Sequence, residues 1–276
     1  MSKIRDGLVR LALIVALLLP VYFLVAALGT KFGVFDWRVG FGLLVFKLGS
    51  LALMIAFGLG VLALLLALLV KPRRGWVLAM VAILIPALAL AFAASVGNSA
   101  KTLPPIHDIA TDVQDPPEFS AAVKAARTAV PGGNGVESMT APMKTLKVYA
   151  TPRMAALADK TVGGLGQAAN PDITSLTLEM PVAAATTLAA SVASKQGLKV
   201  GRVSPAEGAV EAVAESFWFG FKDDVAIRVR PGPDGDTSVV DVRSSSRVGL
   251  SDLGANARRV RGLLTAIKAE AGKAEG

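Results

Sequence analysis

Three long apolar runs fill the first hundred residues of this 276-residue chain, and none of them contains a charged side chain. The runs are Leu11–Thr30, Leu48–Val70 and Gly75–Ala100. A helix of about 20 apolar residues is long enough to cross a hydrocarbon core about 30 Å thick. We therefore expect three membrane-spanning helices, at about residues 10–30, 48–70 and 75–96, followed by a separate polar region over residues 101–276.

Net charge divides at the same point as hydropathy. The whole chain carries +8, of which residues 1–100 account for +7 and residues 101–276 for only +1. The excess of Lys and Arg therefore flanks the apolar runs and leaves no basic stripe on the polar region, so we expect no nucleic-acid partner. The polar region is long enough to form one domain with its own core. Because the chain has no cysteine, disulfides and thiolate chemistry are excluded.

Two basic clusters indicate the orientation of the spans. They consist of Lys3, Arg5 and Arg10 before the first run, and Lys71, Arg73 and Arg74 in the turn before the third. Short loops rich in Lys and Arg stay on the cytoplasmic side of a membrane. Three spans place both clusters inside, so we expect the amino terminus inside, and the Thr30–Lys47 loop and the polar domain outside. The uncharged runs lack the charged groups that ion and proton relays need, which disfavours a pump.

Two further features of the spans leave alternatives open. The first run has the basic start and small terminal residues of a cleaved signal peptide, but its apolar core is longer than a usual signal core. We therefore favour a retained span. In the second run, Ala52, Ala56 and Gly60 share one helix face, because they recur every four residues. We expect this face to pack against the neighbouring spans, with dimerisation as the alternative.

Strand and helix signals in the polar region follow the order strand, helix, four strands, helix. The expected elements are a strand at Ser175–Met180, a helix from Pro181 to Gly197, strands near Leu198–Val203, Val210–Phe219, Val225–Arg230 and Ser238–Ser244, and a helix from about Leu253 to Ala271. Before them, Pro104–Ile109 is expected to be an extended segment. Consecutive strands with short links favour an antiparallel sheet covered by helices. We predict a membrane-anchored α+β fold.

The last two strands allow a specific prediction of register. Valines and isoleucine alternate with charged residues on both strands, and only one alignment places apolar residues opposite each other. That alignment pairs Ile227 with Val242, Arg228 with Asp241, and Val229 with Val240. A slip of one residue would place valines opposite arginines. The connecting loop is then Pro231–Thr237.

Three stretches of the polar region resemble one known family. They are Pro104–Asp112, Phe217–Val225 and Val242–Asn256, of which the third is the most specific. Together they resemble a family catalogued as a domain of unknown function, number 1499, over about residues 104–270. The resemblance says nothing about the three spans, but it implies a bacterial envelope setting. Together with the orientation that the basic clusters indicate, this setting leads us to expect the spans in the inner membrane, the amino terminus in the cytoplasm and the domain in the periplasm. The resemblance implies no activity and no catalytic residues.

The segment that joins the last strand to the last helix is the first candidate site. Arginines near the exposed amides of a helix start can bind phosphate, carboxylate or a lipid headgroup, and Ser251 or Asp252 can cap the helix. The candidate ligand-binding residues are Arg243, Arg247, Ser251, Asp252, Asn256 and Arg259. The alternative is a structural corner, in which the arginines bond loop carbonyls and nearby acids.

An acidic pair and the only histidine form the second candidate set: Asp223, Asp224 and His107. We expect the two aspartates in a tight turn, and adjacent carboxylates on a strand would point to opposite faces and cooperate poorly. His107 with Asp108 and Asp112 would be a thin metal-ligand set from one segment, so we expect no metal and no cofactor. The competing interpretation makes His107 a hydrogen-bonded anchor between the linker and the domain.

The chain therefore carries no motif that discloses a reaction. We expect a non-enzymatic binding or interaction module of the cell envelope, in contact with the lipid bilayer and with an anionic or lipidic small ligand or other envelope proteins. A hydrolase or transferase acting on envelope substrates is the alternative, with Asp223, Asp224 or His107 involved. A structural subunit of a membrane complex is the third hypothesis.

Overall fold

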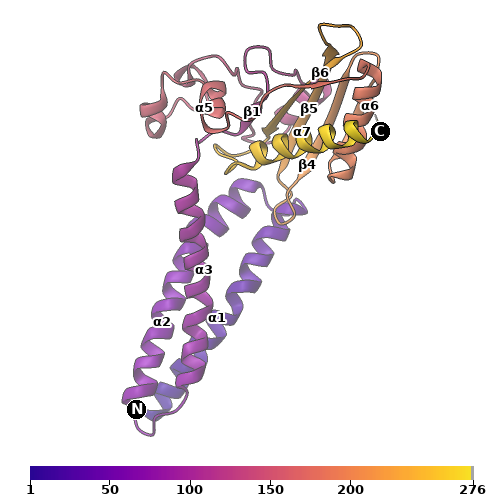
Figure 1. The fold of residues 1–276 in the computed structure, drawn as a ribbon. Coiled ribbons are helices and arrows are strands. Elements are labelled where there is room, and N and C mark those ends of the chain that lie inside the picture. Colours follow the sequence, from indigo (N-terminus) through magenta and orange to yellow (C-terminus); the bar gives the residue numbers. More distant parts are fainter. Residues whose placement is uncertain (275–276) are drawn as a thin grey trace. The chain divides into compact units, whose positions relative to one another are not determined.

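The computed structural model describes residues 1–274 and contains two compact units (Figure 1). One unit is Met1–Ser99 together with the short segment Phe217–Gly220, and the other is Ala100–Ser216 with Phe221–Gly276. We refer to residues 1–99 as the three-helix unit and to the second unit as the α+β domain. Each is described by itself below.

The three-helix unit contains three helices that are long and apolar enough to cross a membrane. They are α1 (Ser2–Lys31), a continuous helix made of the π-helical η1 (Arg38–Gly49) and α2 (Ser50–Leu69), and α3 (Trp76–Thr102). The expected outer loop Thr30–Lys47 is therefore wrong in extent, because the chain is already helical from Arg38. The cations Arg38 and Lys47 do not interrupt this helix, since both side chains are exposed and Arg38 pairs with Asp36 at 2.9 Å.

Small residues hold the three helices together. The fully buried positions are almost all alanines, such as Ala12, Ala56 and Ala82. A Cβ atom on Gly60 would lie only 2.9 Å from Cγ1 of Ile83, so α2 and α3 approach each other closely at this glycine. The face predicted from the four-residue spacing therefore packs within the unit.

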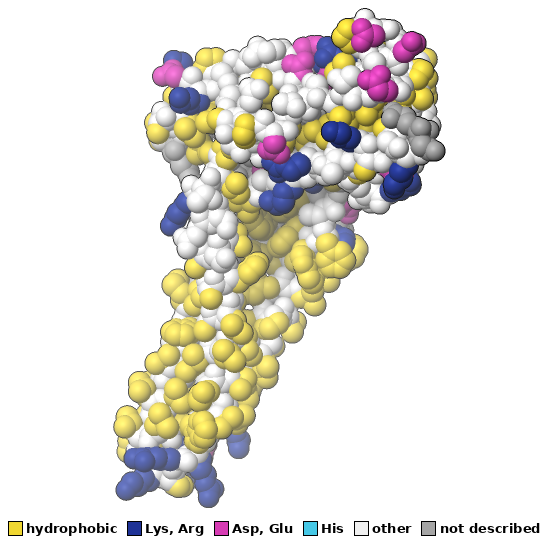
Figure 2. Space-filling model, in the orientation of Figure 1, with side chains coloured by type: hydrophobic (Ala, Val, Ile, Leu, Met, Phe, Trp, Pro, Cys, Tyr) yellow, Lys and Arg dark blue, Asp and Glu magenta, His cyan; other side chains and the backbone are white. Residues whose placement is uncertain are grey.

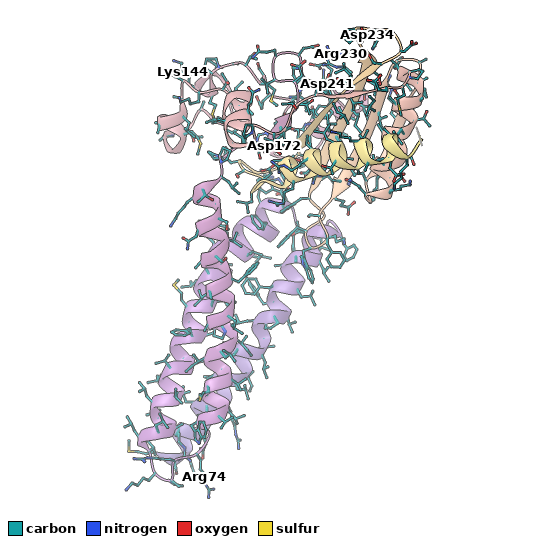
Figure 3. All side chains as sticks on the ribbon, viewed as in Figure 1. Arg74, Lys144, Asp172, Arg230, Asp234 and Asp241 are labelled. Carbon is teal, nitrogen blue, oxygen red and sulfur yellow. The ribbon has the colours of Figure 1, made fainter. Side chains whose placement is uncertain are left out.

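The two basic clusters meet at one end of the three-helix unit (Figure 2). Arg5 is buried there and donates hydrogen bonds to the carbonyls of Val70, at 3.1 Å, and Pro72. Arg74 lies at the same end (Figure 3). The amino-terminal segment thus caps the carbonyl end of α2, where a helix leaves acceptors unpaired.

The α+β domain contains one antiparallel sheet of six strands. Its elements are β1 (Asp108–Ala110), α4 (Ala121–Thr128), short 3₁₀ turns at Met143–Thr145 and Pro152–Leu157, α5 (Val162–Ala169), β2 (Leu176–Leu178), α6 (Val182–Lys195), β3 (Lys199–Ser204), β4 (Ala209–Glu215), β5 (Lys222–Pro231), β6 (Ser238–Ser246) and α7 (Ala255–Ala274). The strand order is β1-β6-β5-β4-β3, and β2 pairs with β6 beside β1. The predicted α+β fold is confirmed, with β1 as an additional strand where only an extended segment was expected.

The predicted hairpin register is confirmed in full. The structure pairs Ile227 with Val242, Arg228 with Asp241, and Val229 with Val240. Helices α6 and α7 cover the face that carries these apolar residues (Figure 1). Their buried side chains, among them Val192, Leu263 and Ile267, complete the main core of the domain.

The two strand boundaries on either side of Gly220 differ most from the expectation. Strand β4 ends at Glu215 rather than at Phe219, because the chain turns at Gly220, whose φ is +65°. Strand β5 begins at Lys222 and therefore includes Asp223 and Asp224. The tight turn expected for this aspartate pair is wrong, because the turn precedes it.

Candidate functional site

The sheet face opposite α6 and α7 is charged and largely buried. Successive side chains of a strand point to opposite faces, so the register places Asp224, Arg228, Asp241 and Arg243 together on this second face. Residues 111–140, which include α4, cover it. Charges in such a position are stable only if they are paired and hydrogen-bonded. Three ion-pair clusters meet this requirement.

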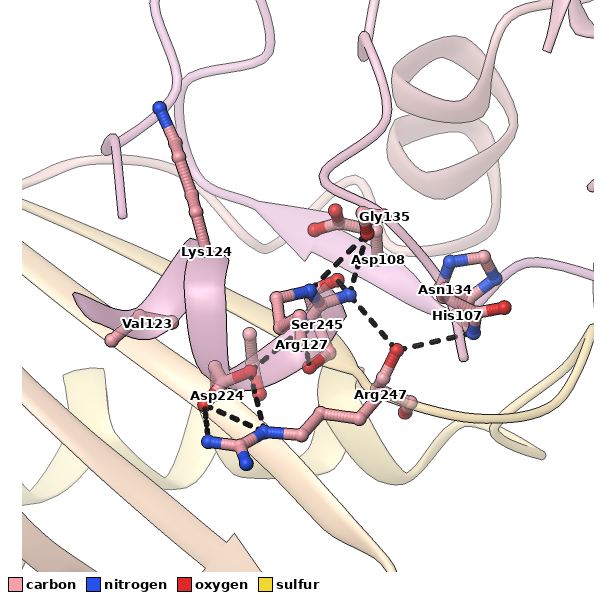
Figure 4. Close-up of polar contacts among 12 residues, drawn as sticks. His107, Asp108, Val123, Lys124, Arg127, Asn134, Gly135, Asp224, Ser245 and Arg247 are labelled. Atoms are coloured by element: carbon pink, nitrogen blue, oxygen red, sulfur yellow. Dashed lines mark hydrogen bonds and ion pairs between the residues drawn. The ribbon is translucent and has the colours of Figure 1, made fainter. Parts of the chain in front are cut away.

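The first cluster joins two arginines to one carboxylate (Figure 4). Asp224 accepts from Nη1 of Arg127 at 2.9 Å and from Nη2 of Arg247 at 2.6 Å. Arg127, from α4, is 1 % exposed and also donates to Ser245 and to the carbonyl of Gly135. Two cations on one carboxylate leave this cluster with a net positive charge.

The second cluster fixes β6 to β1. Arg243 donates from Nε and Nη2 to the two carboxylate oxygens of Asp108, at 3.1 and 2.9 Å, and both side chains are buried. The Nη2 group also donates to the carbonyl of Glu137 at 3.0 Å. The ring of Phe119 lies 5.3 Å from the Arg243 guanidinium and 5.8 Å from that of Arg127. This contact is within the range of cation–π attraction.

The third cluster includes the predicted cross-strand pair of Arg228 and Asp241 (Figure 3). Buried Asp241 accepts from Arg228 at 3.0 Å and from Arg230 at 2.8 Å. Both arginines also contact the carboxylate of Asp115 at 3.0 Å, and they lie near Asp112. Asp112 is therefore part of an arginine network. The segment that follows β1 is thereby held against the sheet.

An open pocket of about 610 Å³ lies over this charged face. Lys124, Arg127 and Arg243 contribute its cations, and Glu118 and Glu137 contribute its acids. Burial and the nearby Asp108 raise the pKa of Glu137. Lys124 pairs with Glu118 at 2.7 Å at an exposed position. The pocket thus presents groups of both signs to a ligand, and its two arginines are already paired with Asp108 and Asp224.

The candidate residues around the start of α7 do not form one site. Arg243 and Arg247 lie on the charged face, whereas Arg259 pairs with Asp223 at 2.7 Å on the helix-covered side. The expected gathering of the three arginines is wrong, because the sheet separates them. The structural interpretation of this corner fits better, since each arginine has an internal carboxylate.

The helix start itself is occupied by the chain. The carboxylate of Asp252 accepts from the amides of Gly254, at 2.7 Å, and Asn256, at 2.9 Å. Ser251 accepts from the amide of Leu253 at 3.3 Å. Buried Asn256 donates to the carbonyl of His107 at 2.9 Å, so it ties α7 to the segment before β1. Asp252 therefore fills the position that an external anion would take.

Asp223, Asp224 and His107 also lie apart. The two aspartates point to opposite faces of β5, as their adjacency predicted, and each binds arginine. His107 is fully buried, and its Nδ1 shares a hydrogen bond with the Tyr149 hydroxyl at 2.9 Å. Burial lowers the pKa of His107 to about 4, so the ring is neutral at pH 7. These contacts fit the interpretation of His107 as a hydrogen-bonded anchor.

Within residues 1–274, no group of three or more His, Cys, Asp or Glu side chains is arranged to hold a metal ion. His107, Asp108 and Asp112 therefore do not assemble a ligand set. Asp108 instead engages Arg243, and Asp112 engages the arginines of β5.

Sequence reasoning missed the residues of α4 and its flanks. Arg127, Phe119 and Glu137 shape the charged face, yet none belongs to a recognisable motif. One feature of the sequence could have pointed to Arg127. It is a long charged side chain on the short helix Ala121–Thr128, where most side chains are small. Its partner Asp224 is 97 positions away, so spacing along the chain cannot reveal the pair.

Comparison with known protein families identifies the family of this chain. No curated protein matches the chain. A protein-family model described as "Protein of unknown function (DUF1499)" matches residues 108–267, which is more than half of the chain and nearly all of the α+β domain. The three helices that are long and apolar enough to span a membrane precede the matched region. The chain therefore belongs to the DUF1499 family.

Proposed function

We propose that this chain is a bacterial inner-membrane protein whose periplasmic α+β domain is a binding module of the cell envelope. Its amino terminus lies in the cytoplasm, and three spans deliver the domain to the outer side. The ligand carries both an anionic group and an amine, as a zwitterionic phospholipid headgroup does. The observation that carries the binding role is the 610 Å³ pocket over the charged sheet face.

The orientation follows from the charged end of the three-helix unit. The clusters around Arg5 and Arg74 share that end, and α3 begins beside it and runs to the other end. The positive-inside rule assigns the charged end to the cytoplasm. A carboxy-terminal alkaline phosphatase fusion should therefore be active, whereas an inactive fusion beside an active cytoplasmic reporter would reverse the orientation.

The ligand chemistry follows from the lining of the pocket. Lys124 offers an exposed ammonium to a phosphate or carboxylate, and charge-assisted hydrogen bonds of this kind are strong. Glu137 is half-buried and offers a carboxyl to an amine, which would hold that carboxyl ionised by lowering its raised pKa. Arg127 and Arg243 form the floor and stay in their internal ion pairs. The pocket therefore binds without displacing a buried contact.

The candidate catalytic residues Asp223, Asp224 and His107 all have partners inside the domain, which supports binding over catalysis. Asp223 and Asp224 each hold an arginine, and His107 is buried against Tyr149. A general acid or base must reach the substrate proton within hydrogen-bond distance. These three side chains are committed to internal contacts on separate parts of the domain.

Native mass spectrometry of the full chain, extracted in mild detergent from its own membranes, tests the pocket. We expect a retained phospholipid on the wild-type protein and its loss in Lys124→Ala and Glu137→Gln. Lys144→Ala is the matched control, because Lys144 forms a similar exposed pair with Asp159 at 2.6 Å but does not line the pocket. Equal retention in all four proteins, or none in the wild type, would refute the pocket as the binding site.

A further inference from the structure

The turn between β4 and β5 has an unusual composition and a fixed shape. Residues 217–220, here called the aromatic tip, are Phe, Trp, Phe and Gly. Glu215 pairs with Lys222 at the end of the ladder. Beyond it, the amide of Ser216 donates to the Phe221 carbonyl at 2.8 Å, and the Phe221 amide donates to the Ser216 hydroxyl at 2.9 Å. These bonds close the turn, so the tip is a preformed projection.

The aromatic tip, which belongs to the unit of the three helices, carries the most exposed apolar side chains after position 100 among the described residues. Phe217 is 72 % and Trp218 55 % exposed, and their rings meet edge to face at 5.0 Å. Among the described residues after position 100, Val203 and Leu253 are the only other large apolar side chains that are exposed. Two adjacent aromatic rings held in water are unfavourable. Trp and other amphipathic aromatic side chains favour the membrane–water interface.

The chain length between the two units keeps the domain next to the bilayer. Helix α3 ends at Thr102 and β1 begins at Asp108, so five residues connect them. Even fully extended, this connection spans only about 20 Å. Residues 217–220 themselves belong to the unit of the three helices. Nζ of Lys31, the last residue of α1, donates to the carbonyl of Phe217 at 2.7 Å, and the Phe219 ring meets the Phe41 ring at 5.2 Å.

We propose that the aromatic tip inserts Phe217 and Trp218 into the headgroup region of the bilayer that holds the spans. Lys222 and Lys199, which are exposed beside the end of the hairpin, would favour anionic phospholipids. The tip would thus be a second membrane contact of the domain, besides its covalent tether. This inference needs the membrane insertion of the proposed function but neither its orientation nor its ligand.

Tryptophan fluorescence of the full chain tests the inserted tip directly. Trp37 and Trp76 lie at the starts of helices in the three-helix unit, so both are replaced by Phe to leave Trp218 alone. The protein is reconstituted in vesicles of phosphatidylethanolamine and phosphatidylglycerol, 3:1, with and without bromine on the acyl chains near the headgroup. We expect brominated lipid to reduce Trp218 emission at least twofold.

The matched control moves the indole to the other end of the same strands. Val203 is exposed and pairs with Val210 near the start of β4, whereas the tip follows its end. In the variant Trp218→Phe/Val203→Trp, brominated lipid should leave the emission unchanged. Equal quenching at both positions, or none at Trp218, would overturn the proposal. A Trp218 shielded from acrylamide but not quenched by brominated lipid would indicate a protein partner and would also overturn it.

A second label covers the case in which the tryptophan variants fold poorly. Because the chain has no cysteine, Phe217→Cys introduces a single thiol for a spin label without any further change. In the same vesicles, a label at 217 should be relaxed more by oxygen than by a water-soluble nickel complex. The reverse order would place the tip in water and contradict insertion.

Discussion

The three-helix unit and the α+β domain bury different kinds of residue. In the helices, the buried positions are mostly Ala and Gly. Among the described residues of this unit, Arg5 is the one charged residue that is buried, and it lies at one end. In the domain, Arg127, Asp224 and Arg243 are buried along with the apolar core. Helices with apolar outer surfaces associate through close packing of small residues. The domain can instead enclose charges, because the fold supplies each with partners.

This difference locates where specific chemistry can occur. A unit packed by small residues positions its helices, and its buried positions are almost all apolar. The charged sheet face of the domain instead offers polar groups, and it lies under the pocket. The predictions below challenge this division, beginning with the largest expected effect.

The shared carboxylate of Asp224 should be the most sensitive single position. Asp224→Ala leaves buried Arg127 and partly buried Arg247 without their shared acid, which costs about 3–5 kcal/mol. The melting temperature of the full chain in detergent, followed by circular dichroism, should fall on the order of 10 °C. The matched Asp234→Ala, in an exposed loop, should leave it unchanged. A similar melting temperature for both variants would mean that the charged face is not held by this pair.

Acid should weaken the domain through His107. Its folded pKa of about 4 lies below the ordinary value of 6.5, so the unfolded chain takes up the proton first. The stabilising contribution is complete above pH 6.5 and is lost as the pH falls towards 4, by on the order of 3 kcal/mol in total. Thermal unfolding at pH 7, 6 and 5 should therefore show a smaller loss in His107→Gln than in the wild type. Parallel pH dependence in the two proteins would contradict a buried neutral histidine.

A large side chain in place of glycine should disturb the packing of the helices at Gly60 but not at Gly58. Gly60→Leu forces a side chain against Ile83 and should destabilise the three-helix unit by about 1–3 kcal/mol. Gly58→Leu is the control on the same helix, because no atom lies within 4 Å of a Cβ there. Sodium dodecyl sulfate titration of the two proteins measures the difference. A greater loss in Gly58→Leu would mean that this face is not the packed one.

The sequence predicted those parts of the fold that depend on local periodicity. The hairpin of β5 and β6 has one alignment that joins apolar to apolar residues, so alternation was enough to fix Arg228 opposite Asp241. The three apolar helices followed from run length. Strand β1 has only three residues and gains its identity from pairing with β6, a contact that periodicity does not encode.

The candidate site was less predictable, because its contacts are distant along the chain. Arg243, Arg247 and Arg259 are close in sequence, yet Ser244 and α7 lie on one face of the sheet while Arg243 lies on the other. The alternation of side chains along a strand predicts that Arg243 and Ser244 lie on different faces, whereas the proximity of the arginines in sequence suggested one cluster. The pairing of Arg127 with Asp224 needs the tertiary fold, since α4 must first pack on the sheet.

The central claim is that the pocket over the charged face binds a ligand bearing an anionic group and an amine. The most direct measurement is the melting temperature of the full chain with and without millimolar glycerophosphoethanolamine. A ligand that binds only the folded state raises the melting temperature. We predict a rise of a few degrees for the wild type, and no rise for Glu137→Gln despite an unchanged melting temperature without ligand. The same rise in both proteins, or no rise in the wild type, would contradict the claim.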